Sequence, residues 1–177
     1  MLRIRAVTDI KVDLLVNHEV LRNFPGSLNF PFDELYREIV TRIKTVEISS
    51  ECVLFDSVQS FNETMGFGDP DYWLAGYSPE EIAQFWVFGQ NGQGDLWLFD
   101  LESRVYFYDH NLEQMCRENF LDLGLNFSRW LQFAQLNKQL DIVYDIENEL
   151  TEKRKEEYRS RLNELSELLL RNYPFYI

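Results

Sequence analysis

Carboxylate side chains near the ends of three apolar segments are the residues whose type and spacing could do chemistry in this chain. They are Asp95, Asp100, Glu102, Asp109 and Glu113. Paired carboxylates can catalyse acid–base steps or bind a metal ion. Carboxylates at strand ends are also common solvated groups, and they can contact the basic cleft of a protein partner. Because no complete catalytic motif accompanies them, we favour solvated groups and partner contacts over catalysis.

The histidines and cysteines do not form a recognisable site. His110 follows Asp109, and His18 is far away in the sequence, with no HxxH or HExxH spacing. A zinc site usually needs at least three protein ligands. We therefore interpret Asp109 and His110 as a hydrogen-bonding pair at the end of a strand. Cys52 and Cys116 lie among apolar residues without a CxxC motif, which favours buried free thiols in a reducing compartment.

A glycine-rich segment at residues 89–95 superficially resembles a loop that binds phosphate. Such loops run from a strand into a helix, whose N-terminus faces the anion. Here a strand follows, and Asp95 would repel a phosphate. Asn91 and Gly92 instead predict a tight turn between two strands, because both tolerate positive φ, and Gly94 would allow a bulge or a slightly longer loop. The chain also lacks the Gly-x-Ser-x-Gly turn of a nucleophilic serine. We predict a protein that is not an enzyme and that uses no cofactor or metal ion.

The elements that position these carboxylates form a predicted β-meander at about residues 84–109. Three aromatic and aliphatic segments are separated by two short turns, and both faces of each segment carry large side chains. Such a sheet is either covered on both sides or presents an aromatic face to a partner. The aromatic residues in and before the meander are Tyr72, Trp73, Tyr77, Trp86, Trp97, Tyr106 and Tyr108. Any exposed Trp or Tyr among them would make a good interface anchor.

The segments before the meander are less uniform. Residues 1–24 fit either a strand or a helix, and Asp33 caps a predicted short helix. Residues 45–49 and 52–55 look like strands, and residues 65–71 look like a loop. Ser78 begins a helix of a single turn, with a proline at its first position and a glutamate that can close a capping box.

After residue 112 the pattern becomes helical. A helix begins at Asn126, and its apolar stripe is formed by Phe127, Trp130, Leu131 and Ala134. The apolar pattern lapses near Thr151, which predicts a break between two helices. The last helical segment has a narrow stripe of Leu162, Leu165, Leu168 and Leu169. This stripe can pack on the domain or against a second copy of the chain, so we expect a monomer or a homodimer.

Size and charge limit the classes of function. The 177 residues suffice for one domain with a sizeable core, and the net charge is 17 − 30 = −13. Such an acidic chain is a poor direct ligand for nucleic acid and favours a basic protein partner, although acidity also serves solubility. The N-terminus lacks the apolar region of a signal peptide, and no apolar segment approaches a membrane span. We expect a cytoplasmic protein without membrane contact.

The pattern from residue 86 to residue 131 resembles the SUKH superfamily. The similarity lies in an apolar strand ending in Gly89, a Gly94-Asp95 turn into a strand ending in Asp100, the segment Val-Tyr-Phe-Tyr-Asp-His at residues 105–110, and a following helix that contains Phe127. It covers about residues 72–135. The superfamily includes the yeast cell-wall assembly regulator family and many bacterial immunity proteins of polymorphic toxin systems.

The resemblance implies an α+β fold, in which a central, mostly antiparallel sheet is flanked by helices. We expect a single domain over residues 1–177, with a C-terminal helical extension at about residues 136–177. The resemblance also implies a non-enzymatic immunity protein that neutralises a cognate toxin, often a nuclease, by direct complex formation. An intracellular scaffold or regulatory interaction module is an alternative, and a small ligand binder or enzyme is a third. The residues expected to face the partner are Asp95, Glu102, Asp109, Glu113, Trp97 and Tyr106.

Overall fold

A six-stranded antiparallel sheet lies at the centre of the computed structural model, which describes residues 1–16, 23–112 and 115–177. The strands lie side by side in chain order, so every neighbouring pair is connected without a crossover. They are β1 (Val46–Ser49), β2 (Cys52–Leu54), β3 (Trp86–Gln90), β4 (Leu96–Phe99), β5 (Val105–Tyr108) and β6 (Leu121–Leu125). The α+β fold and the meander formed by β3, β4 and β5 confirm the predictions from sequence.

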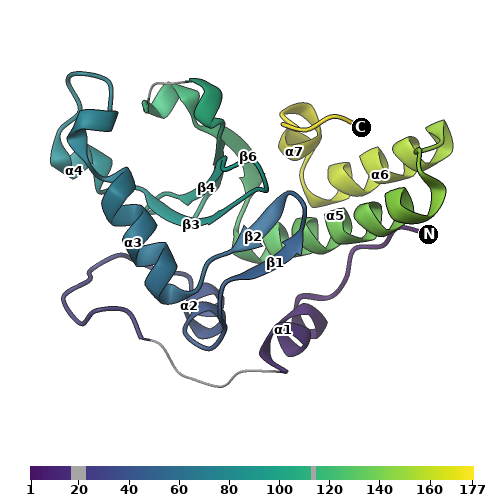
Figure 1. Cartoon of the computed structure of the whole chain (residues 1–177), viewed down its shortest axis with the longest axis horizontal. Helices are drawn as coiled ribbons and strands as arrows, with labels where there is room; N and C mark the ends of the chain where they lie inside the picture. The colour runs from purple at the N-terminus through teal and green to yellow at the C-terminus, as the bar shows by residue number, and fades with distance from the viewer. Residues whose placement is uncertain (17–22, 113–114) are drawn as a thin grey trace.

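Helices cover both faces of this sheet (Figure 1). The α-helices are α1 (Val7–Leu15), α2 (Glu34–Val40), α3 (Ser57–Phe67), α4 (Pro79–Ile82), α5 (Phe127–Glu147), α6 (Glu152–Leu165) and α7 (Glu167–Arg171). Three single turns of 3₁₀-helix complete the described part, at η1 (Pro70–Tyr72), η2 (His110–Leu112) and η3 (Arg117–Asn119). Within the described residues, no helix is long and apolar enough to cross a membrane.

Alternating side chains of the meander enter two separate hydrophobic clusters. Trp86, Trp97 and Phe107 point into the larger cluster, which also contains residues of α1, α2, α5, α6 and α7. Leu98 and Tyr106 point to the opposite face, where they join residues from the segment between α3 and β3. Because successive side chains of a strand point to opposite faces, both sets become buried once helices cover the sheet. The sheet is therefore covered on both sides, and the aromatic side chains of β3, β4 and β5, all within the described part of the chain, are buried.

Several local predictions are confirmed and others are wrong. Ser78 begins α4 with the expected capping box, and Asp33 caps α2. Residues 7–15 form a helix, and residues 17–22 of the ambiguous N-terminal segment lie outside the described residues. Residues 65–67, expected in a loop, form the last turn of α3, and β6 interrupts the segment that was expected to be helical.

The turn between β3 and β4 is longer than a two-residue hairpin. Gly94, with φ of 94°, is the residue of this turn in the left-handed region, whereas the sequence placed positive φ at Asn91 and Gly92. The Asn91 side chain bridges the loop, because its Oδ1 accepts from the backbone N–H groups of Gln93 and Asp95, both at 2.9 Å. The alternative of a longer loop around Gly94 is the one observed.

The C-terminal helices pack on the same core as the rest of the chain. Helix α5 runs through the boundary expected near residue 136, and its buried positions extend from Phe127 to Leu140. Thr151 caps α6, which confirms the predicted break between two helices. Leu162, Leu165 and Leu169 are buried in the larger cluster. The leucine stripe therefore packs mainly on the domain itself.

Candidate functional site

Asp95 acts as a structural link at one end of the meander. Its carboxylate is nearly buried, with the residue 5% exposed. Oδ1 accepts from the backbone N–H of His110 at 3.1 Å and lies 2.6 Å from Nδ1 of the same residue, while Oδ2 accepts from Nδ2 of Asn91 at 2.8 Å. The side chain therefore joins the β3–β4 loop to the end of β5. The predicted Asp109–His110 pair is wrong in its partner: the His110 ring contacts Asp95, whereas Asp109 accepts from Asn111.

Asp100 has an equivalent role in the turn between β4 and β5. Its carboxylate accepts from the backbone N–H groups of Glu102 and Arg104 at 3.0 and 2.9 Å, and from Nε of Arg104 at 2.8 Å. The Tyr106 hydroxyl donates to the same carboxylate at 3.1 Å. Burial, reinforced by the charge of Asp100, raises the pKa of Tyr106 to about 12. The raised pKa extends the pH range in which the tyrosine is protonated and can donate to the aspartate toward more alkaline pH.

The remaining residues expected to face a partner do not form one surface with Asp95. Trp97 is fully buried and Tyr106 is 7% exposed, so neither can be the exposed aromatic anchor that was expected. Glu102 is exposed and pairs with Arg104, and Asp109 is partly exposed. Hydrogen bonds from the backbone and side chain of Asn111 lower the pKa of Asp109. Glu113, the last member of the set, lies outside the described residues.

Asp95, Asp109 and His110 are close enough together to be considered as ligands of one metal ion. Ligand atoms of Asp95, Asp109 and His110 lie within 4.8 Å of one another, and among the described residues this is the group that meets that criterion. The internal Asp95–His110 contact already occupies a carboxylate oxygen and a ring nitrogen. The geometry is thus accounted for by hydrogen bonding that holds the meander together.

Glu51, whose carboxylate lies near Asn91 of the β3–β4 loop, has surroundings that disfavour its negative charge. Burial raises the pKa of Glu51, and the nearby charges of Asp141 and Asp95 act in the same direction, whereas a hydrogen bond from Asn91 opposes them. Asp141 is itself held by the backbone N–H and the hydroxyl of Ser50, both at 2.9 Å. Like charges gathered at this end of the sheet disfavour ionisation of Glu51.

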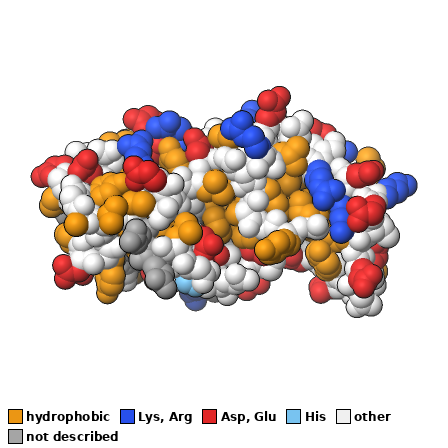
Figure 2. Space-filling view, turned by 90° about the horizontal axis from the view of Figure 1, so that it is seen from above, with side chains coloured by type: hydrophobic (Ala, Val, Ile, Leu, Met, Phe, Trp, Pro, Cys, Tyr) orange, Lys and Arg blue, Asp and Glu red, His pale blue; other side chains and the backbone are white. Residues whose placement is uncertain are grey.

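An acidic and partly apolar surface lies over the α3–α4 segment. We define the α3–α4 face as the exposed side chains of residues 57–82. Its large apolar members are Val58, Met65, Tyr72 and Leu74, and its acidic members include Glu63, Asp69, Asp71 and Glu80. Figure 2 shows hydrophobic and acidic side chains gathered at the left end of the molecule, which carries α4 in Figure 1. Tyr72 is its most exposed large apolar residue, at 63%.

Local hydrogen bonds hold Tyr72 on this face. Asp69 caps the η1 turn by accepting from the backbone N–H of Asp71 at 3.0 Å, and Pro70 begins the turn. The next residue, Trp73, is buried and donates from Nε1 to the carbonyl of Phe67 at 2.7 Å. Because Trp73 is anchored in the core, the adjacent Tyr72 side chain is left in solvent.

The sequence carries a signal for this surface that motif analysis missed. From residue 45 to residue 103 the chain has no lysine or arginine, and it has 11 aspartates and glutamates. Tyr72 belongs to the aromatic group noted from the sequence but was not among the residues expected to face a partner. Arg117 is a cation near this region, with its guanidinium carbon 5.9 Å from the centre of the Phe85 ring.

Comparison with protein-family models, curated proteins and solved structures finds no match to this chain.

Proposed function

We propose that this chain is a non-enzymatic binding protein that holds a basic protein partner on its α3–α4 face. We further propose that it is a cytoplasmic immunity protein that neutralises a cognate bacterial toxin, with a basic nuclease as the expected class of toxin, by direct complex formation. The observation that carries the proposal is a solvent-exposed tyrosine, preceded in sequence by Asp69 and Asp71, in an acidic segment without lysine or arginine.

The chemistry of the α3–α4 face suits protein recognition. Tyrosine is enriched among the residues that dominate binding energy, because it brings a large rigid apolar area together with a hydroxyl group. Tyr72 can supply such an anchor, and Met65 and Leu74 are further exposed apolar side chains of the same segment. The surrounding carboxylates would accelerate encounter with a basic partner and would make association sensitive to salt.

The proposal of an immunity function depends on the resemblance to the SUKH superfamily as well as on the acidic charge. An intracellular scaffold or regulatory module with the same fold is the competing interpretation. Genome context separates the two: a toxin reading frame beside this gene favours immunity, whereas its absence favours the scaffold. The leucine stripe is largely occupied within the chain, so we expect a monomer by light scattering.

The test is a binding measurement with the basic product of the neighbouring reading frame. Replacing Tyr72 by Ala should weaken binding at least about 30-fold, which corresponds to the loss of a binding hot spot of about 2 kcal/mol. Tyr176→Ala is the matched control, because Tyr176 is fully exposed at the C-terminus, and it should change affinity less than about twofold.

Salt dependence provides the second arm of this test. Association with the basic product should slow steeply as the salt concentration rises, because screening shortens the reach of the carboxylates to about 3 Å at 1 M salt. Equal affinities for the Tyr72→Ala and Tyr176→Ala variants would exclude the α3–α4 face as the binding surface. A lack of binding to any basic partner would count against the function itself.

A further inference from the structure

A cavity beside strand β1 is bordered mainly by basic residues, although the chain as a whole is strongly acidic. It has a volume of about 690 Å³ and is bordered by the N-terminal segment, α1, the α2–β1 connection, β1 and α5. We call it the β1 groove. Five of the chain's 17 lysines and arginines border it, namely Arg3, Arg5, Arg42, Lys44 and Lys138, whereas only two of its 30 acidic residues do so.

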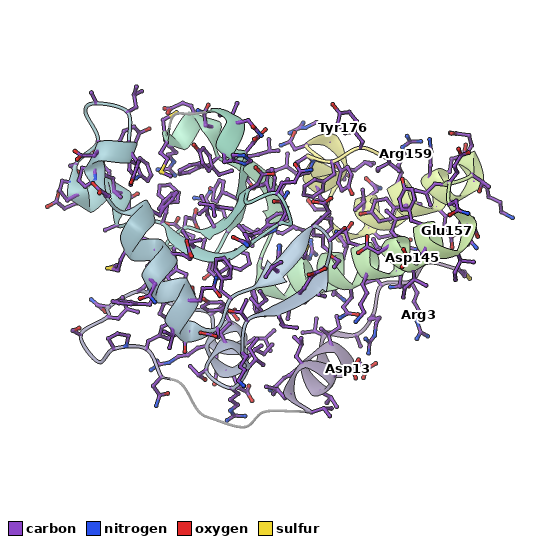
Figure 3. All side chains as sticks on the ribbon, viewed as in Figure 1. Arg3, Asp13, Asp145, Glu157, Arg159 and Tyr176 are labelled. Atoms are coloured by element: carbon purple, nitrogen blue, oxygen red, sulfur yellow. The ribbon has the colours of Figure 1, made fainter. Side chains whose placement is uncertain are left out.

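Two of these cations are available to a ligand. Arg5 is engaged by Asp13 at 2.8 Å and by Gln135 at 3.2 Å, and Arg42 pairs with Glu38. The side chains of Arg3 and Lys138 have no ion-pair partner among the described residues, and both are exposed. Figure 3 shows Arg3 on the N-terminal segment and Asp13 on α1, both below α5 in this view. The unpaired positive charges favour an anionic ligand.

One border of the groove is an open sheet edge. Strand β1 is the first strand of the sheet, and it pairs with β2 on one side. Within the described residues no strand pairs with its other side, and residues 45–48 border the groove. An edge strand presents unpaired backbone N–H and C=O groups, to which an extended peptide can add as a further strand. Backbone pairing of this kind distinguishes a peptide from a small anion.

The size and lining of the groove also fit a peptide. A strand residue occupies roughly 160 Å³, from a rise of about 3.3 Å, a strand spacing of about 4.8 Å and a sheet spacing of about 10 Å. The groove therefore has room for about four residues, and β1 is four residues long. Apolar side chains line it beside the cations, including Leu14, Val46 and Ile142. A peptide that alternates acidic and apolar residues would meet both kinds of lining.

We propose that the β1 groove is a docking site for an acidic polypeptide segment, which binds in extended form beside β1 with its carboxylates near Arg3 and Lys138. This site lies on elements different from the α3–α4 face and carries the opposite charge. It therefore does not depend on the function proposed above, and a failure of either proposal leaves the other standing.

The probe is a short synthetic peptide in which Glu and Val alternate, titrated by fluorescence anisotropy at low salt. The double variant Arg3→Glu/Lys138→Glu should weaken its binding by at least about tenfold, because two attractions become repulsions. The matched control, Lys153→Glu/Arg159→Glu, makes the same change in net charge on α6, where Figure 3 shows Arg159 on the other side of α5. It should change affinity less than about threefold.

A variant that is expected to strengthen peptide binding separates the effect of charge from a folding defect, since a defect could only weaken binding. Glu47 is exposed and borders the groove, so Glu47→Gln should strengthen peptide binding. Strand addition is tested separately with the same peptide N-methylated at alternate residues, which removes backbone donors and should abolish binding. Hydrogen exchange at the amides of residues 46–48 should slow when the unmodified peptide is bound.

Three results would overturn the proposal. One is the absence of peptide binding, and another is equal binding by the groove and control double variants. The third is undiminished affinity of the N-methylated peptide together with displacement by inorganic tripolyphosphate at similar concentrations. That result would assign the groove to small anions instead of a polypeptide.

Discussion

Replacement of Asp95 by Ala tests whether the carboxylates of the meander hold the fold together or face a partner. The substitution removes the acceptor of three hydrogen bonds, two from His110 and one from Asn91. Hydrogen bonds to a charged group contribute about 1.5–3 kcal/mol each, but the half-exposed His110 side chain regains water. Asn91 is buried and loses its good acceptor, which costs about 1–3 kcal/mol.

The total is a destabilisation of about 2–4 kcal/mol, a large fraction of the 5–15 kcal/mol that is typical of a domain. Urea unfolding at pH 7, followed by circular dichroism, measures this loss as a lower midpoint with an unchanged slope. Glu102→Ala is the matched control, since Glu102 is exposed and, among the described residues, its side chain pairs with Arg104 alone, and it should cost less than about 0.5 kcal/mol. An Asp95→Ala protein of unchanged stability that no longer binds its partner would refute the structural assignment.

The other predictions concern the sheet, the acidic loop and the C-terminal helices. Gly89→Ala should destabilise the protein by at least about 2 kcal/mol in urea unfolding, because a Cβ there would overlap the Val53 carbonyl oxygen of the neighbouring strand; an unchanged midpoint would contradict this. Glu51→Gln should stabilise the protein at pH 7, since a raised carboxyl pKa costs stability as pH rises through it, and the gain should vanish below the usual carboxyl pKa. A gain that persists at acidic pH in the unfolding series would show another cause. Leu162→Ala should cost about 2–5 kcal/mol, because Leu162 is fully buried. A partial loss of helical signal in circular dichroism, with the strand signal unchanged, would instead mark the C-terminal helices as a separate unit.

The meander was predictable because its signals are local. Alternating large side chains and a loop rich in Asn and Gly require no knowledge of distant contacts. Helix α3 was missed for a physical reason, since its core-facing positions include Ser60 and Thr64. Ser60 donates to the carbonyl of Val87 at 2.6 Å, and Thr64 accepts from the backbone N–H of Val87 at 2.9 Å. A helix that packs through hydroxyl groups leaves little hydrophobic periodicity to detect.

For the α3–α4 face, the sequence predicts the acidic and aromatic composition but not which side chains are exposed. The acidic charge and the abundance of aromatic residues are visible in the sequence, but exposure depends on which helices cover the sheet. Trp97 and Tyr106 are buried because the two faces of the meander are covered by elements distant in the sequence. Tyr72 stays exposed because its neighbour Trp73 occupies the core. The β1 groove likewise combines residues from both halves of the chain, such as Arg3 and Lys138, that no local pattern connects.

Hydrogen exchange of the chain with and without its basic partner tests the central proposal most directly. If the α3–α4 face holds the partner, amides of residues 57–82 should exchange more slowly in the complex, while those at the turn between β4 and β5 should be unaffected. Protection confined to that turn or to the β1 groove, with residues 57–82 unchanged, would contradict it.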